Sequence, residues 1–202
     1  MNNKENIMDI NTLLFPDFET LDAFGAVEVL GRVEEYHLRY FSIGGGTVVS
    51  SQGVKIDTEP LKDSDDSGVL LIPGGQGARP LLDDADFIRT LTDVAEHSKY
   101  CLTVCTGSVL LAKTGLLDDR SATSNKRAME WVKSTFPNVN WLCHARWVTD
   151  GKIYTSSGIS SGIDMALGFI SDRFGREKAA DVAESIEYIW SVNKNSDPFS
   201  LS

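Results

Sequence analysis

The strongest constraint on the fold of this chain is a pair of short apolar runs, residues 69–72 and 101–104. Each run is followed by a turn of small residues and then by a helical pattern. A run that is apolar at nearly every position, rather than at alternate ones, is typical of a strand buried on both faces of a sheet. The two runs therefore predict the interior of a parallel sheet between two layers of helices.

The remaining sequence continues this alternation of strand and helix patterns. Further strands are expected at residues 8–15 and 37–43, with antiparallel pairs at 47–50 with 54–58 and at 147–149 with 153–155. Helices are expected at residues 21–30, 83–98, 107–113, 125–136, 163–174 and 177–190. We expect an α/β fold: a three-layer sandwich with a mostly parallel, doubly wound sheet, helices on both faces and a small antiparallel hairpin. Without a linker or repeat, residues 1–202 are expected to form a single domain.

The charge and the apolar patterning exclude several classes of partner. The net charge is −10 and no basic stripe offsets it, so no nucleic-acid partner is expected. Uncharged runs such as residues 154–163 are rich in Ser and Gly and too short to span a bilayer, and residues 1–9 lack an apolar leader core. Three cysteines with no disulfide spacing suit a reducing compartment. We therefore expect a cytoplasmic protein with no membrane partner.

The cysteines and histidines form no pattern that suits a metal ion. Cys101 and Cys105 belong to one extended segment, which puts their backbones roughly 13 Å apart, too far for a shared ion or a disulfide. The histidines, His37, His97 and His144, are scattered and make no ligand pair at helical spacing. No metal site and no cofactor are expected.

The candidate site lies where three strands end, because doubly wound sheets bind ligands at the carboxyl ends of their strands. Asp22 follows the first strand, Gly74 and Gly75 follow another, and Cys105 and Thr106 follow a third. The small residues around Cys105 suit a sharp strand-to-helix elbow that presents a nucleophile. A thiol at a helix N-terminus is expected to have a lowered pKa. The amides of Gly75 and Thr106 are candidate oxyanion donors.

Each of these residues also has a plainer interpretation. A free cysteine is often a small buried apolar side chain, and two glycines often make only a tight turn. Asp22 opens a helix, where an aspartate usually serves as a cap. Glu28, six residues further on, is the alternative carboxylate.

Five segments resemble the ThiJ/PfpI superfamily, a branch of the class I glutamine amidotransferase-like fold that includes isonitrile hydratases. They are Phe15-Pro-Asp-Phe-Glu-Thr-Leu-Asp22, Pro73-Gly-Gly-Gln-Gly77, Thr103-Val-Cys-Thr-Gly107, Ala112-Lys-Thr-Gly-Leu-Leu117 and Thr155-Ser-Ser-Gly-Ile-Ser-Ser-Gly-Ile-Asp164. The resemblance runs from about residue 10 to residue 190. It implies that Cys105 is the nucleophile, that Asp22 is its acidic partner and that Gly75 and Thr106 are the backbone donors. It also implies a homodimer.

Two positions distinguish this chain within that superfamily. Thr103 stands two residues before the cysteine, as in the isonitrile hydratase branch, where amidotransferases have glycine. Asn125 stands where many members, including hydratases, have a histidine, and an amide cannot shuttle a proton as an imidazole does.

The resemblance implies an isonitrile hydratase-like enzyme, a lyase acting on a small electrophilic substrate. It would hydrate an isonitrile to an N-substituted formamide through a thioimidate on Cys105. The alternatives are a redox or electrophile sensor, a non-catalytic small-molecule-binding protein, and a glyoxalase, deglycase, amidase or protease-like hydrolase.

Overall fold

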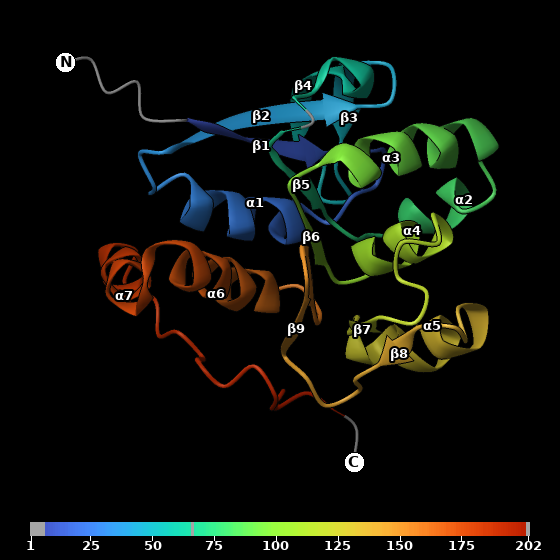
Figure 1. Ribbon diagram of the computed structural model, residues 1–202. Coiled ribbons are helices and arrows are strands. Elements are labelled where there is room, and N and C mark those ends of the chain that lie inside the picture. Colours follow the sequence, from blue (N-terminus) through green and yellow to red (C-terminus); the bar gives the residue numbers. More distant parts are fainter. Residues whose placement is uncertain (1–6, 66, 201–202) are drawn as a thin grey trace.

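A computed structural model describes residues 7–65 and 67–200 and places a central sheet between two layers of helices (Figure 1). The strands of this sheet are β1 (Met8–Leu13), β2 (Tyr36–Ser42), β3 (Gly46–Val49), β4 (Lys55–Pro60), β5 (Val69–Ile72), β6 (Tyr100–Val104), β9 (Trp147–Asp150) and β10 (Ile153–Ser156). Within the described residues their order is β3-β4-β2-β1-β5-β6-β10-β9. The pairs from β4 to β10 are parallel, whereas β3–β4 and β9–β10 are antiparallel. The α/β class, the mostly parallel doubly wound sheet and the antiparallel hairpins are confirmed.

The two faces of the sheet bury separate apolar clusters. Along β5, Val69 and Leu71 belong to one cluster, while Leu70 and Ile72 belong to the other, and all four side chains are fully buried. The first face carries α1 (Thr20–Leu30) and α6 (Ser161–Phe174), with α7 (Arg176–Ser185) beside α6, and the second carries α2 (Ala78–Leu81), α3 (Ala85–His97) and α4 (Gly107–Lys113) (Figure 1). A strand between two helix layers has no solvent-facing side, which explains its continuous apolar run.

Short elements account for most differences from the predicted elements. The helix expected at residues 125–136 divides into η2 (Lys126–Ala128) and α5 (Met129–Thr135). The structure adds η1 (Leu61–Asp63), the four-residue α2 and a small parallel pair of β7 (Ser121–Ala122) and β8 (Asn140–Trp141). Such elements span too few residues to show a hydrophobic period.

The last expected helix is wrong at its end, because α7 stops at Ser185 and not at residue 190. The hydrogen bonds of the following segment explain the early stop. Tyr188 Oη donates to Asp164 Oδ1 at 3.1 Å, and Trp190 Nε1 donates to the carbonyl oxygen of Asp164 at 3.2 Å. Leaving the helix allows both side chains to reach this buried carboxylate residue on α6.

The polar tail expected from residue 195 onward packs against the body of the protein. Asp197 is buried, its backbone N–H donates to the carbonyl oxygen of His144, and its Oδ1 lies 3.6 Å from Arg146 Nη1. The expectations that concern residues 1–6 and 201–202, among them the leader and the two ends of the single domain, fall outside the described residues. None of the helices in the described ranges has the length and apolar character needed to cross a membrane.

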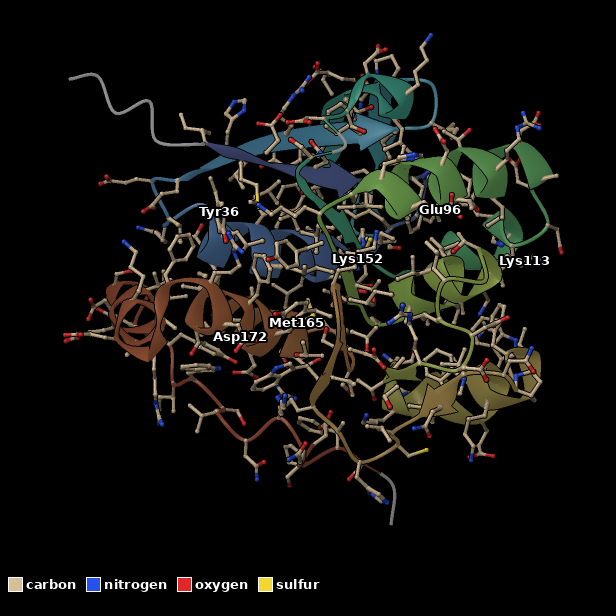
Figure 2. The ribbon with its side chains drawn as sticks, in the orientation of Figure 1. Tyr36, Glu96, Lys113, Lys152, Met165 and Asp172 are labelled. Atoms are coloured by element: carbon tan, nitrogen blue, oxygen red, sulfur yellow. The ribbon has the colours of Figure 1, made fainter. Side chains whose placement is uncertain are left out.

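Lys152, in the turn between β9 and β10, fixes the helix that precedes β6. Its Nζ donates to the carbonyl oxygens of Ala95, Glu96 and Ser98 at 2.8, 2.7 and 3.0 Å. Figure 2 labels Lys152 and Glu96, which come from the β9–β10 turn and from the last turn of α3. A cation at this position satisfies carbonyl groups that the end of a helix leaves without partners.

Candidate active site

Cys105 occupies a strained turn between β6 and α4. Its φ is 59°, in the left-handed region that residues with a Cβ rarely adopt. Gly107 permits the chain reversal, because a Cβ there would lie 2.2 Å from the carbonyl oxygen of Ile72. The chain therefore turns at Cys105, as its small neighbours predict.

Hydrogen bonds from separate segments hold this elbow in place. The carbonyl oxygen of Cys105 accepts from Ser108 Oγ and from Ser124 Oγ, both at 3.0 Å. The backbone N–H of Cys105 is shared between the carbonyl oxygens of Ser156 and Ser157, at 3.2 and 3.0 Å. These bonds offset the cost of the strained backbone and fix the direction in which the thiol points.

Three N–H donors converge on the sulfur atom of Cys105. Asn125 Nδ2 donates to Sγ at 3.1 Å. The backbone N–H groups of Thr106 and Ile159 are also hydrogen-bonded to the thiol and act to lower its pKa. Donors in this arrangement favour negative charge on sulfur.

Asp22, in the first turn of α1, supplies a carboxyl group with no solvent exposure. Its Oδ2 accepts a hydrogen bond from the backbone N–H of Gly74 at 3.0 Å, whereas Oδ1 has no partner among the described residues. Burial raises the pKa of Asp22 to about 7, although the Gly74 N–H and the nearby Cys105 thiol act to lower it. A carboxyl group with this pKa can both donate and accept a proton near neutral pH.

The expected lowering of the Cys105 pKa is wrong for this geometry. Burial raises the pKa of Cys105 to about 12, and the negative charge of Asp22 contributes to the rise. The donors from Asn125, Thr106 and Ile159 offset only part of it. Because Asp22 and Cys105 interact, they titrate as a pair, and the resting site holds a protonated thiol beside a carboxyl group that ionises near neutrality.

The glycines at the end of β5 let the three strand ends meet. A Cβ on Gly74 would lie 2.6 Å from the backbone nitrogen of Thr106 and 2.8 Å from Asp22 Oδ2. Gly75 has a φ of 131°, and its N–H donates to Thr106 Oγ1 at 3.2 Å. The Gly75 amide is therefore engaged, and it becomes available to a ligand only when the Thr106 hydroxyl turns away.

The structure thus brings together the predicted Asp22, Gly74, Gly75, Cys105 and Thr106. The alternative carboxylate, Glu28, lies on the surface and pairs with Arg32.

A cavity of about 400 Å³ opens beside Cys105, Thr106, Gly75 and Asn125. Its lining also includes Glu19, Gln76, Arg79, Arg127, Ala128 and Ile159. Sequence reasoning did not identify Ile159, because residues 153–155 were expected only as part of a hairpin. In the structure β10 also pairs in parallel with β6, so its carboxyl end meets the elbow and carries Ile159 to the thiol. The sequence feature that could have identified Ile159 is a fourth strand end that is followed by the small residues Ser157 and Gly158.

Within the described ranges, none of the three histidines lines the Cys105 cavity. His37 lies 3.0 Å from Asp9 at the surface, and His97 and His144 are also exposed. The cysteines Cys101, Cys105 and Cys143 are all free, and the described residues contain no group of three or more His, Cys, Asp or Glu side chains that could hold a metal ion.

Comparison with known proteins gives one family and several relatives. The model of the DJ-1/PfpI family matches residues 8–172. The isonitrile hydratase of Pseudomonas putida is 30% identical over 184 residues, which cover 90% of this chain and 78% of that protein. The transcriptional regulator CdhR of Pseudomonas aeruginosa is 29% identical over 85% of this chain, which spans 52% of that regulator.

Solved structures agree with the family match. A ThiJ/PfpI family protein from Pseudomonas syringae superimposes with a TM-score of 0.80 at 25% identity, covering 98% of this chain and 80% of that one. DJ-1beta of Drosophila melanogaster superimposes with a TM-score of 0.76 at 24% identity, covering 91% of this chain and 99% of that one. The likeness extends over the whole sheet and both helix layers.

Proposed function

This chain belongs to the DJ-1/PfpI family, and we propose that it is a cysteine-dependent hydratase that converts an isonitrile into an N-substituted formamide. Cys105 is the nucleophile, and Asp22 moves the protons. The amide of Thr106 contacts the sulfur, the amide of Gly75 binds the reacting group once the Thr106 hydroxyl turns away, and Gly74 allows the close approach. The isonitrile hydratase among the relatives supports this assignment.

The observation that carries the proposal is a cysteine paired with a buried carboxyl group and contacted by an amide instead of an imidazole. Asn125 Nδ2 lies 3.1 Å from the sulfur at the position where a histidine would act as a base. Asp22 also lies near the thiol, and its pKa of about 7 suits proton transfer. Isonitrile hydration requires a nucleophile and one proton carrier, and this pair supplies both.

The reaction proceeds in balanced steps. The sulfur forms a bond to the terminal carbon of the isonitrile, and the thiol proton passes through Asp22 to that same carbon, which gives a thioimidate. Water then adds to this carbon, with Asp22 taking a proton from the water and delivering it to nitrogen. Finally the carbon–sulfur bond breaks, the electron pair returns to sulfur, the hydroxyl proton restores the thiol, and the formamide leaves.

The same geometry disfavours one of the alternatives. A glyoxalase or protease that uses a cysteine–histidine pair needs an imidazole at the thiol, and in the described residues Asn125 occupies that place.

The test is incubation of the purified protein with a neutral alkyl isonitrile and detection of the formamide by NMR. We expect turnover in the wild type and in His144→Ala, and none in Cys105→Ser. Acid quenching during turnover should trap an adduct on Cys105 whose added mass equals that of the intact isonitrile. Binding without turnover or adduct would instead support a small-molecule-binding protein.

We also propose that the chain forms one domain that works as a homodimer in a reducing compartment such as the cytoplasm. The free state of all three cysteines is compatible with that environment.

A further inference from the structure

Two arginines stand at the cavity of Cys105, and neither has a carboxylate partner in the part of the chain that the structure describes. Arg79, on α2, and Arg127, on η2, both line the cavity and are exposed. Within the described residues no carboxylate lies at ion-pair distance from either guanidinium, whereas Arg39, Arg120 and Arg146 each have such a partner. In a chain with a net charge of −10, the gathering of two unpaired cations at one cavity requires an explanation.

Both arginines belong to segments that build the cavity, and each segment has a contact that fixes it. Arg79 follows Gly75 by four residues, and its guanidinium carbon lies 4.3 Å from the centre of the Trp131 ring. This stacking holds the planar group while leaving its N–H edge free to bind an anion. Arg127 follows Asn125 by two residues and donates its backbone N–H to Asn125 Oδ1 at 2.9 Å.

The other charged side chain in the lining is Glu19. Its Oε1 already accepts a hydrogen bond from Gln52 Nε2 at 2.8 Å. Two guanidinium groups outnumber the one carboxylate of the lining, and the buried Asp22 beside the thiol has a pKa of about 7, so it carries only part of a negative charge at neutral pH. The lining is therefore positive, and a concave site with low-dielectric walls strengthens that potential. A planar carboxylate matches the fork of N–H donors that a guanidinium presents.

We propose that Arg79 and Arg127 form an anion subsite, and that the substrate of Cys105 is a small electrophile that carries a carboxylate group. That the electrophile is an isonitrile rests on the proposed function. In that case the substrate is an isonitrile that carries a carboxylate group. The carboxylate binds at the mouth of the cavity and directs the terminal carbon toward the sulfur. A neutral isonitrile lacks this orientation and reacts with a higher KM.

The subsite can be tested without any turnover by alkylating the thiol with anionic iodoacetate and with neutral iodoacetamide. The same sulfur attacks both reagents, so a change in the pKa of Cys105 alters both rates equally and leaves their ratio unchanged. We expect the iodoacetate-to-iodoacetamide ratio at Cys105 to fall about tenfold in Arg79→Gln/Arg127→Gln, because two cations no longer attract the anion. Arg79→Lys keeps the charge and should retain most of the ratio.

Two controls are built into the chain. Cys143 does not line the cavity, so its ratio should not change in any of these variants. Arg89→Gln removes an exposed guanidinium on α3 that pairs with Asp86, and it should leave the ratio at Cys105 unchanged. An unchanged ratio in the double variant, or an equal fall in Arg89→Gln, would overturn the subsite.

The second measurement compares a carboxylate-bearing isonitrile with its methyl ester. We expect kcat/KM to favour the carboxylate in the wild type, and this preference to fall about tenfold in the double variant, mainly through KM. Turnover of both substrates with no preference contradicts the subsite but preserves the hydratase. Turnover of neither, with the alkylation ratio as expected, contradicts the hydratase but supports the subsite.

Discussion

At the scale of single residues, the site depends on how Asp22 and Cys105 divide their protons. Both groups are buried, and burial raises the pKa of each. A thiol that is protonated at rest gains its nucleophilicity only when its proton can leave. Reactivity is therefore coupled to the arrival of a substrate that accepts this proton at carbon.

Asp22→Asn tests this coupling because it keeps the shape of the side chain and removes its charge. We expect turnover to fall about a hundredfold or more, since general acid–base catalysis is lost. The pKa of Cys105 should nevertheless fall, because the charge of Asp22 helps to raise it. The pH dependence of iodoacetamide labelling at Cys105, followed by peptide mapping, measures this shift. A rise in the thiol pKa would mean that Asp22 stabilises the thiolate by sharing its proton.

At the scale of elements, the elbow requires that the end of β5 and the start of α4 lie in contact. Gly107 provides that contact, since a Cβ there would approach the carbonyl oxygens of Ile72 and Pro73 at 2.2 and 2.8 Å. Neither partner is the movable end of a flexible side chain. A substitution must therefore displace backbone.

Gly107→Ala is expected to destabilise the protein by about 1–3 kcal/mol, the usual cost of forcing an extra carbon into a packed interior. Gly44→Ala is the matched control, because Gly44 has no neighbouring atom within 4 Å of the added Cβ. Urea unfolding followed by circular dichroism measures both variants. Equal midpoints for Gly107→Ala and the wild type would show that the turn adjusts without strain.

The elements also show what the sequence could and could not predict. The strands around 69–72 and 101–104 were predictable because burial on both faces leaves a continuous apolar run. The end of α7 was not, because it depends on the contacts of Tyr188 and Trp190 with Asp164 across the fold. The raised pKa of Cys105 could not be predicted either. A helix N-terminus is visible in the sequence, but the burial that raises this pKa arises only when the layers assemble.

At the scale of the whole molecule, the buried carboxyl group of Asp22 affects stability as well as chemistry. Its pKa rises from 3.8 to about 7 on folding. Between these two values the folded state holds a proton that the unfolded state has lost, so the contribution of Asp22 to stability decreases as the pH rises through this window.

We therefore expect Asp22 to make the fold less stable at pH 8 than at pH 4.5 by a few kcal/mol, at about 1.4 kcal/mol per pKa unit. Asp22→Asn should lack this part of the pH dependence and should be more stable than the wild type at pH 8. Urea unfolding of both proteins at the two pH values measures the difference. Parallel curves for the two proteins would contradict the raised pKa.

The oligomeric state is a second property of the whole molecule. We expect a homodimer, following the family resemblance, and light scattering at micromolar concentration gives the mass directly. The chain has a mass of 22.1 kDa, so a dimer is expected at twice that value. A monomer mass throughout this concentration range would rule the dimer out.

The way in which the elbow is held has a consequence for how such a protein can evolve. The place of the sulfur is set by main-chain bonds to Ser156 and Ser157 and by glycines that permit close approach. The cavity wall, by contrast, is carried by short helices whose side chains, such as Arg79 and Arg127, are exposed. Mutations in the wall can therefore change substrate preference with little loss of reactivity at the sulfur. Related proteins with this fold can therefore come to accept different substrates through changes in the cavity wall while they keep the same nucleophile.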